Sequence, residues 1–409
     1  MSTGLRQFAV VNAKLAASRR IAMLFASALA LASCNTTGGD VPSPVDISTG
    51  APTPQVDSAP LPGGGIGDAF GAGPVRVGMI LPLTQNGNPS PIGQALRNAA
   101  QLAVEGAGSS DISIIVEDDR STPEGATQAA QAELAAGAQI LVGPLFAPDV
   151  RAVGPIAKAA GKPVIAFSTD SSAASNGVYL LSFLIESYVD RIIDYAASKG
   201  KKSIVVLAPL NEYANVAVTE AQIEAAKLHL KLISVQRYSP GQPAGAVQEI
   251  AGITEPVDAV FVAEQIDGMG ALSAALAASS IRAQLLGTGV WNDPKVLKLP
   301  AVQGAWFSSP ESAGFLSFAD RYRTKFKSDP PRLATLSYDA VTLVAALAHA
   351  QGPAAFSAAT LTNPSGFNGA DGVFRFRADG SNERGLAVMQ ITNGAATVIA
   401  PASHTFAGG

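Results

Sequence analysis

The chain has 409 residues and a formal net charge of −4, from 28 Lys and Arg against 32 Asp and Glu. Only 15% of the residues are charged, and no basic stripe with interleaved aromatic residues is present, so the composition argues against a nucleic-acid-binding protein. The hydrophobic content is 47%, and the roughly 330 residues that follow the N-terminal region are enough for two domains of ordinary size.

The N-terminal segment has the parts of a secretory signal. Basic residues precede an apolar stretch, Ile21–Leu31, that is shorter than the about 20 residues needed to span a bilayer. The run that ends this stretch, Leu31–Cys34, resembles the lipobox of bacterial lipoproteins, in which the cysteine is lipidated and becomes the mature N-terminus. We therefore predict a lipoprotein signal peptide at 1–33 and lipidation of Cys34. A plain secretory signal with an incidental cysteine is the alternative.

A tether is predicted after Cys34, which is the only cysteine and has no disulfide partner. Residues 34–74 are rich in Gly, Pro, Ser and Thr, and such a composition cannot bury enough apolar surface to offset the entropy of ordering. A relaxed chain of about 40 residues spans roughly 35 Å. Within it, Gly65–Gly71 superficially resembles a dinucleotide-binding loop, but it precedes the first strand, so it is interpreted as linker.

From Val75 onward, short apolar segments alternate with Ala-rich segments. The first series predicts strands at 75–81, 112–116, 139–142 and 163–167, and helices at 93–105, 123–136 and 149–160. A second series predicts strands at 203–208, 232–238, 259–263 and 284–287, with helices at 213–230 and near Ala246 and Gly270. Two βα series of this kind predict two α/β lobes with largely parallel sheets.

Two further elements follow these series. The apolar segment 335–350 is predicted to be a buried helix. Two apolar runs, 372–376 and 386–391, flank the turn signal 378–381, and this arrangement predicts a hairpin.

Ligands of open parallel sheets bind beyond the carboxyl ends of the strands. The loops at these ends carry hydroxyls, amides, a few acids and three aromatic side chains; they are 82–91, 118–122, 143–149, 167–172, 209–213, 264–268 and 288–292. Small polar groups on rigid strand ends are typical of a recognition site. One of these runs, Asp118–Arg120, is interpreted as a solvated, self-neutralising cluster, with a place in the ligand cleft as the alternative.

Enzymatic motifs are missing from the sequence. The three histidines have no metal-ligand spacing, so neither a metal nor a cofactor is predicted. Ser198–Lys201 fits S-x-x-K, yet it lies at a predicted helix end and the K-T-G and S-D-N partners of that motif are absent. There is no G-x-S-x-G elbow and no P-loop. We therefore predict a binding protein and not an enzyme.

Four runs carry a resemblance to the type I periplasmic binding proteins, the class of the leucine/isoleucine/valine receptor. They are Val77–Leu83, Ile140–Leu145, Lys162–Ala166 and Ser337–Ala340, and their order and spacing make the resemblance. It implies an α/β fold of two lobes, with parallel sheets flanked by helices and a cleft between the lobes. It also implies that lobe 1 comprises 75–186 plus 311–360, and lobe 2 comprises 187–310 plus 370–400.

The resemblance further implies which loops contact the ligand. In lobe 1, the first corresponding loop offers Ala147 and Pro148, which have no side-chain donor. The second offers the well-equipped run Ser168, Thr169, Asp170 and Ser171, whose alternative reading is an ordinary capped turn.

In lobe 2, Tyr213 falls at the position of a family aromatic, and Gln265 stands near a second such position. Tyr213 could also be only a boundary aromatic at a helix start. The acid that pairs with the ligand ammonium is replaced near Gly289, so Asp170 or Glu264 would have to supply that charge from another direction. The predicted ligand-binding residues are thus Ser168, Thr169, Asp170, Ser171, Tyr213 and Gln265.

The function implied is that of a lipid-anchored periplasmic receptor, which presents a small polar, amino-acid-like ligand to an ABC permease. The alternative rests on Ile80–Leu83 and Val142–Leu145, which are similar to the penicillin-binding-protein activator lipoproteins. Such a protein would regulate peptidoglycan synthesis by contact with a peptidoglycan synthase. Asn35, next to Cys34, resembles an outer-membrane address in enteric-type sorting, and it favours the outer over the inner membrane.

Overall fold

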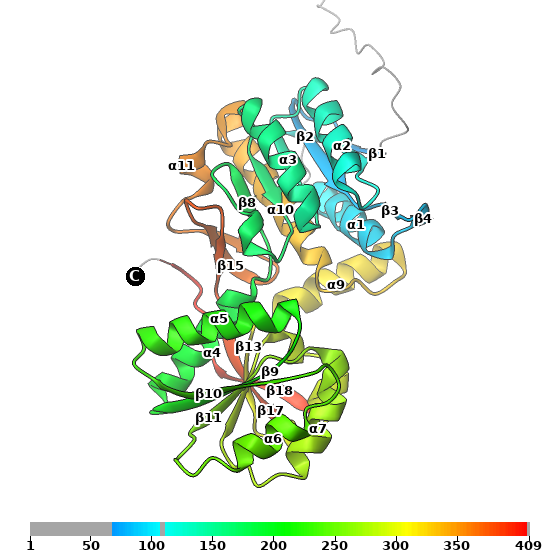
Figure 1. Ribbon diagram of the computed structural model, residues 1–409. Helices are drawn as coiled ribbons and strands as arrows, with labels where there is room; N and C mark the ends of the chain where they lie inside the picture. Colours follow the sequence, from blue (N-terminus) through cyan, green and yellow to red (C-terminus); the bar gives the residue numbers. More distant parts are fainter. Residues whose placement is uncertain (1–67, 107–110, 407–409) are drawn as a thin grey trace, which may run out of the picture. The chain divides into compact units, whose positions relative to one another are not determined.

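The computed structural model describes residues 68–106 and 111–406. The predicted signal peptide, the predicted lipidation site at Cys34 and most of the predicted tether lie outside these residues. Two large sheets form the framework, each covered by helices on both faces (Figure 1). The fold class predicted from the sequence, α/β with parallel sheets flanked by helices, is confirmed.

The first sheet has six strands in the order β1-β5-β2-β6-β7-β8. All neighbours pair in parallel except β1, which is antiparallel to β5. The strands are β1 (Asp68–Gly71), β2 (Val75–Leu81), β5 (Ile112–Asp118), β6 (Ile140–Val142), β7 (Val164–Ala166) and β8 (Val178–Leu180). A small hairpin of β3 (Thr84–Gln85) and β4 (Asn88–Pro89) follows β2, and its turn residues Asn86 and Gly87 both have positive φ, as a two-residue hairpin turn requires.

The alternating side chains of β2 explain how this sheet is covered. Val77, Met79 and Leu81 point into a core with helices α1 (Pro91–Gly106) and α10 (Ala334–Gln351). Ile80 points to the other face, where helices α2 (Pro123–Ala135) and α3 (Ala147–Ala159) pack. We call this sheet and its helices the first lobe.

The second sheet has seven strands in the order β10-β9-β11-β12-β13-β17-β18. The first five pair in parallel, and β17 and β18 are antiparallel. The strands are β9 (Ser203–Pro209), β10 (Lys231–Tyr238), β11 (Ala259–Val262), β12 (Gln284–Gly287), β13 (Trp306–Ser309), β17 (Ala387–Thr392) and β18 (Ala395–Ala400).

Helices α4 (Ile185–Ser198) and α5 (Glu212–Lys227) cover one face of this second sheet. Helices α6 (Ala244–Ala251) and α7 (Met269–Ala277) cover the other face. Successive strand residues alternate between the two cores, as Val205 and Val206 do on β9. The short helix α8 (Pro294–Leu297) follows β12. We call this sheet and its helices the second lobe.

The remaining elements belong with the first lobe. Helix α9 (Ser312–Phe326) packs Phe318 and Tyr322 against Ala95 and Ala99 of α1. A three-stranded sheet of β14 (Phe367–Gly369), β15 (Gly372–Phe376) and β16 (Asn382–Arg384) follows the short helix α11 (Ala358–Leu361). Phe374 and Phe376 of this sheet join the core around α1 and α10.

The predicted hairpin between 372–376 and 386–391 is wrong in its second strand. The turn at 378–381 does join two strands, but β15 pairs with β16, while 387–392 lies in the second sheet between β13 and β18. The reason is burial, because Ala387 and Val388 are fully buried on opposite faces, as in an interior strand. Residues 370–400, which the resemblance assigned to lobe 2, therefore contribute strands to two sheets, with β15 and β16 in the three-stranded sheet and β17 and β18 in the second sheet.

Strand β1 occupies residues that the composition predicted to be linker. Its ladder with β5 runs from Asp68 opposite Val116 to Gly71 opposite Ser113. Arg97 of α1 stacks over the Phe70 ring at 5.0 Å and pairs with Asp68 at 2.5 Å, so α1 fixes this strand to the sheet edge.

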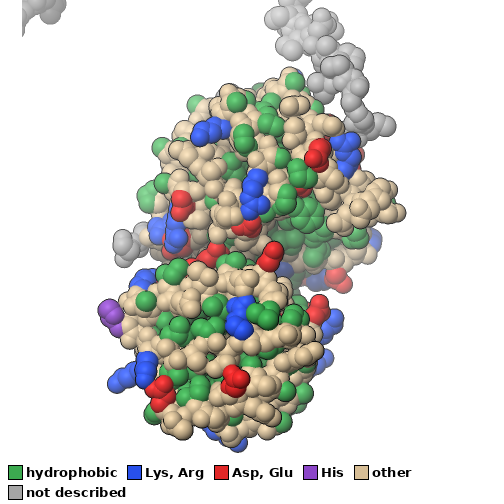
Figure 2. All heavy atoms as spheres, in the orientation of Figure 1, with side chains coloured by type: hydrophobic (Ala, Val, Ile, Leu, Met, Phe, Trp, Pro, Cys, Tyr) green, Lys and Arg blue, Asp and Glu red, His purple; other side chains and the backbone are tan. Residues whose placement is uncertain are grey.

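Charged side chains lie scattered over the face shown in Figure 2, with no basic stripe. Among the residues that the structure describes, no helix is both long and apolar enough to cross a bilayer.

Candidate ligand site at the carboxyl ends of the strands

A pocket of about 510 Å³ lies at the carboxyl ends of the second sheet. Its lining comes from four loops, with Asn211 after β9, Gly241 after β10, Gln265 after β11 and Asp293 after β12. Because parallel strands end at the same edge, these loops converge although up to 82 residues separate them along the chain (293 − 211 = 82). The predicted position of a ligand edge in this lobe thus coincides with a real cavity.

Glu264 is a buried carboxyl group that lines this pocket. Its Oε2 accepts a hydrogen bond of 2.7 Å from the Tyr238 hydroxyl, and its Oε1 accepts one of 2.8 Å from the backbone N–H of Gln265. Burial, together with the bond to Glu264, raises the pKa of Tyr238, which therefore stays a donor. A Cβ at Gly268 would lie 2.2 Å from the carboxyl carbon of Glu264, so only glycine lets the loop pass so close.

Tyr213, predicted as a wall of the cleft, lies in the first turn of α5. Its hydroxyl is 2.5 Å from Oγ1 of Thr288, which is fully buried at the end of β12. Burial raises the pKa of Tyr213 to about 12. Asn211 caps the same helix, because its Oδ1 accepts the N–H of Ala214 at 2.8 Å. The hydrogen bond between Tyr213 and Thr288 joins the ends of β9 and β12, and it holds the Tyr213 side chain in a fixed position. Contact of Tyr213 with a ligand stays a prediction.

Tyr188 of α4 is a buried neighbour of this edge that the sequence patterns did not single out. An added Cβ at Gly289 would lie 2.5 Å from the Tyr188 ring. A side chain at position 289 would therefore require the Tyr188 ring to move. No sequence motif marks Tyr188, because only the folded chain brings it beside Gly289.

In the first lobe, residues 168–171 form a turn whose polar side chains make hydrogen bonds to neighbouring protein groups. Oγ of the buried Ser168 accepts the N–H of Asp170 at 3.1 Å, and Asp170 in turn accepts the N–H and hydroxyl of Ser172 at 3.0 and 2.6 Å. The Ser171 hydroxyl donates to Glu186 at 2.6 Å. Of the four predicted residues, Ser168 is buried, Asp170 and Ser171 are partly exposed, and Thr169 is exposed.

Asp170 is also paired with Arg151. Burial alone would raise the pKa of Asp170, but the bonds from Ser172 and the pair with Arg151 lower it below its usual value. The carboxylate is thus ionised and already neutralised by a cation. The structure shows the capped turn that was the alternative reading, while ligand binding by this run stays a prediction.

The acids nearest the carboxyl ends of the first sheet are more buried than the sequence indicated. Asp119, interpreted as part of a solvated cluster, is 0% exposed, and Asp149 of α3 is 1% exposed. Each leaves its Oδ2 without a hydrogen-bond partner among the described residues. Burial raises the pKa of Asp119 to about 7 and that of Asp149 to about 6. The nearby negative charge of Asp149 also contributes to the raised pKa of Asp119. The interpretation of Asp119 as solvated is wrong, because its loop folds back into the lobe, where Asp119 Oδ1 accepts the N–H of Ser121 at 2.7 Å.

Three other carboxylates gather between α4 and α5. Oxygens of Asp190, Glu220 and Glu224 all lie within 4.8 Å of one another. Lys227 donates to both oxygens of Glu224 at 2.9 and 3.1 Å. Burial and the hydrogen bond with Glu220 raise the pKa of Asp190. A shared proton and the Lys227 ammonium thus offset the charge that a metal ion would otherwise neutralise.

Known proteins of the same fold place this geometry in context. The solved structures include a branched-chain amino acid ABC transporter protein of Rhodospirillum rubrum, with a TM-score of 0.71, 18% identity and coverage of 80% of this chain and 99% of that one. LivJ of Streptococcus pneumoniae in complex with isoleucine has a TM-score of 0.56 and 21% identity, and the match covers 80% of this chain and 99% of LivJ. A Rhodopseudomonas palustris solute-binding protein in complex with benzoate has a TM-score of 0.57 and 20% identity, and the match covers 80% of this chain and 97% of that protein.

At these identities the structures establish the fold alone, and no curated protein sequence matches the chain. A sequence model of a family described as periplasmic binding protein matches residues 74–396, which is most of the chain. The chain therefore belongs to the periplasmic binding protein family.

Proposed function

We propose that this protein is an extracytoplasmic solute receptor, which captures a small amino-acid-like ligand and delivers it to an ABC-type permease. The observation that carries the proposal is the pocket at the carboxyl ends of β9–β12, where the family fold and a cavity of about 510 Å³ coincide. That volume lies within the roughly 300–1,000 Å³ typical of small-ligand sites.

The charges of the pocket favour a ligand with a cationic group. Glu264, Asp267 and Asp293 line it, against Lys295 as the one cation among its lining residues. A ligand ammonium would find carboxylates there, and a ligand carboxylate would find the Lys295 ammonium. The pocket thus supplies the negative charge that is missing near Gly289, and a zwitterion is the best match.

The ligands of structural neighbours support this size class. Isoleucine and benzoate, named in two of their complexes, are both small carboxylates. Isoleucine carries an ammonium as well, and the excess of acids in this pocket favours it over benzoate. Amino acids are therefore the first ligands to test.

We place the receptor in the periplasm, tied to the membrane through Cys34. The support is the lipobox-like run 31–34 and the Gly- and Pro-rich segment that follows it. Asn35 favours the outer membrane as the address.

The test is thermal unfolding of the full chain, refolded from denaturant to remove any bound ligand, in the presence of amino acids and of aromatic carboxylates. A ligand at 100 times its Kd stabilises by about 2.7 kcal/mol, which raises Tm by roughly 5–10 °C, since each kcal/mol is worth about 2–4 °C for lobes of this size. Amino acids should give this rise, and Asp293→Asn and Gln265→Ala should reduce it.

Gln248→Ala, an exposed amide on α6, is the matched control and should leave the rise unchanged. If neither ligand class shifts Tm, the receptor proposal fails. The penicillin-binding-protein activator would then be the hypothesis to test, by binding to a peptidoglycan synthase.

A further inference from the structure

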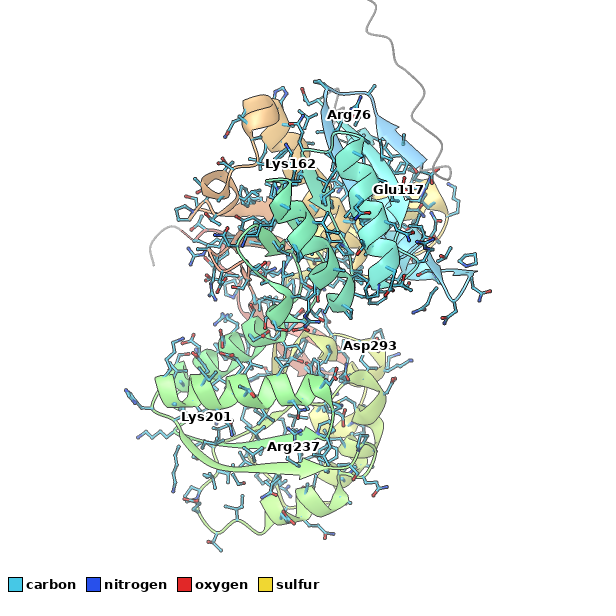
Figure 3. All side chains as sticks on the ribbon, turned by 45° about the horizontal axis from the view of Figure 1, so that its top comes forward. Arg76, Glu117, Lys162, Lys201, Arg237 and Asp293 are labelled. Atoms are coloured by element: carbon cyan, nitrogen blue, oxygen red, sulfur yellow. The ribbon has the colours of Figure 1, made fainter. Side chains whose placement is uncertain are left out.

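We propose that the second lobe has another small-molecule site, at the amino ends of its strands, which binds a compact oxyanion such as a carboxylate or a phosphate. The pocket measures about 490 Å³. Lys201 lines it just before β9, Arg282 and Gln284 where the chain enters β12, and Gln303 and Gly304 just before β13. Figure 3 shows Lys201 and Asp293 at opposite ends of the second sheet, so this site is remote from the proposed receptor pocket.

The charge of this pocket is opposite to that of the receptor pocket. Lys201 and Arg282 line it, and no Asp or Glu does. Within residues 68–106 and 111–406, neither of these two cations is found in an ion pair. In a chain of net charge −4, two cations that line one cavity outside any ion pair attract an anion. Asp258 is the acid that competes for Lys201, because the pKa of Asp258 is lowered by the hydrogen bond from the Lys202 N–H and also by the Lys201 charge.

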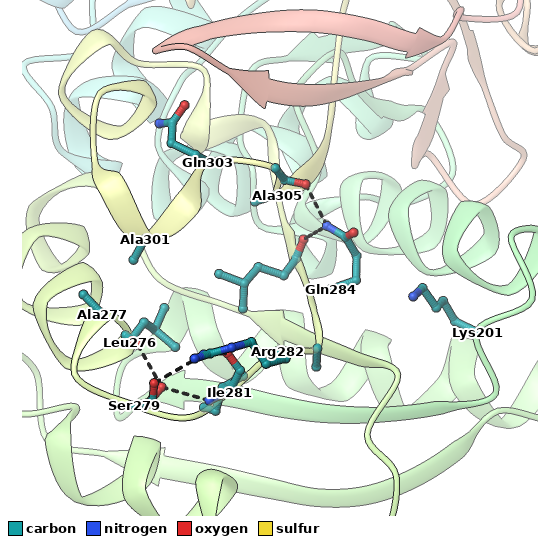
Figure 4. A pocket seen from close by; sticks show the side chains of 13 residues that line it. Lys201, Leu276, Ala277, Ser279, Ile281, Arg282, Gln284, Ala301, Gln303 and Ala305 are labelled. Carbon is teal, nitrogen blue, oxygen red and sulfur yellow. Dashed lines mark hydrogen bonds between the residues drawn. The ribbon is translucent and has the colours of Figure 1, made fainter.

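Neighbouring groups hold both cations in place. Arg282 Nη1 donates to the carbonyl oxygen of Ile281 at 2.9 Å, which leaves other guanidinium N–H groups available. Lys201 Nζ lies 5.9 Å from the Trp306 ring centroid, and Figure 4 shows its ammonium end turned toward Gln284. A carboxylate or phosphate oxygen matches each of these cationic donors, which Figure 4 shows on either side of Gln284.

Gln284 forms a fixed polar wall between the cations. Its Nε2 donates to the carbonyl oxygens of Leu285 at 3.1 Å and Gly304 at 2.9 Å (Figure 4). Because both bonds use the amide nitrogen, Oε1 is left as the acceptor for a ligand hydroxyl.

An adjoining pocket of about 390 Å³ limits the ligand. It shares Lys201, Arg282 and Gln284 with the first pocket but also contains Glu255 and Asp258. A second anionic group would be repelled by these acids, so we expect the rest of the ligand to extend toward Gln303. The site thus fits a small anion and excludes a long polyanion.

The experiment is calorimetric titration of the full chain at low ionic strength, with succinate and inorganic phosphate as separate probes. Lys201→Gln and Arg282→Gln should each weaken binding about tenfold or more, since each removes a charge-assisted contact. Lys202→Gln is the matched control, because Lys202 is an exposed lysine on the same turn that does not line either pocket.

Backbone amide NMR signals of Gln284 and Gly304 should shift on titration and so locate the bound anion. Binding of succinate alone assigns a carboxylate ligand, binding of phosphate alone assigns a phosphate ligand, and binding of both assigns a general oxyanion site. No binding of either probe at millimolar concentration, or equal effects of Lys201→Gln and Lys202→Gln, overturns the proposal. Asp293→Asn should leave this binding intact, so failure here is distinguishable from failure of the receptor proposal.

Discussion

The two lobes share an architecture but differ at the carboxyl ends of their strands. In the first lobe, Ser168, Asp170 and Ser171 are bonded to Ser172, Arg151 and Glu186, so their polar groups are already satisfied. In the second lobe, the loops around Gln265 enclose a cavity with charged lining. The same strand-end position is therefore filled by a hydrogen-bonded turn in one lobe and borders a cavity in the other. Polar groups of both edges bond to the protein, as Glu264 and Asn211 do in the second lobe, so what differs is the space that the loops leave between them.

The substitution Gly268→Ala tests this contrast in the second lobe. The new Cβ would lie 2.2 Å from the carboxyl carbon of Glu264, whose oxygens are held by Tyr238 and the Gln265 N–H. We expect a loss of about 1–3 kcal/mol in the free energy of unfolding, from overpacking. Urea denaturation measures it.

The matched control is Gly270→Ala, two residues later in α7, where an added Cβ meets nothing within 4 Å. It should be neutral or slightly stabilising, because Ala favours a helix. Equal losses for both variants would contradict the assigned role of Glu264.

Asp119→Asn tests the first lobe. The unfolded-state pKa of Asp is about 3.9, and burial raises the folded-state pKa of Asp119 to about 7. Between these values the folded chain holds the extra proton, so stability falls as pH rises from about 4 to about 7 and then stays level. The amide never ionises, so the variant should be more stable than the parent by up to about 4 kcal/mol at pH 8, since each pH unit between the two pKa values is worth about 1.4 kcal/mol. The two should converge below pH 4.

Urea titrations of both chains at several pH values give this difference directly. Asp118→Asn is the comparison, because that side chain accepts bonds from Thr84 at 3.0 and 2.6 Å and should lose stability instead. A parent and Asp119→Asn with parallel pH profiles would show that Asp119 is solvated after all.

The smallest expected effect is that of Arg151→Gln. The pair with Asp170 is on the surface, with side chains 47% and 43% exposed, so its loss should cost less than about 1 kcal/mol. If Asp170 is only a cap, the Tm rise produced by a ligand should be unchanged in this variant. A change in ligand affinity would instead assign the turn to the binding site.

Periodicity predicted most of the framework, because buried parallel strands are short apolar runs separated by helices. Val75–Leu81 and Ser203–Pro209 were placed with almost correct bounds, and Tyr213 and Gln265 follow strands as expected. Periodicity does not reveal contacts between residues that are far apart in the sequence. Strand β1 has little apolar content and owes its place to Arg97 and the edge of β5.

The candidate site was less predictable than the fold, because it depends on which groups meet. Nothing local indicates that Asp119 folds inward or that Tyr188 fills the space beside Gly289. The cationic pocket joins residues 201, 282 and 303, which only the parallel sheet brings together. In the sequence, Lys201 stood out only as the last residue of the S-x-x-K match, which was interpreted as a helix end.

Strand β1 has a practical and a mechanical consequence. A chain trimmed to begin at Val75 would lose it and leave the β5 edge, with Ile112 and Ile114, open to pairing with another molecule. Soluble versions should therefore begin before Asp68. If the chain is anchored through Cys34, any pull on the anchor is borne first by a four-residue ladder and the Arg97 clasp, which makes β1 the first part of the body to yield.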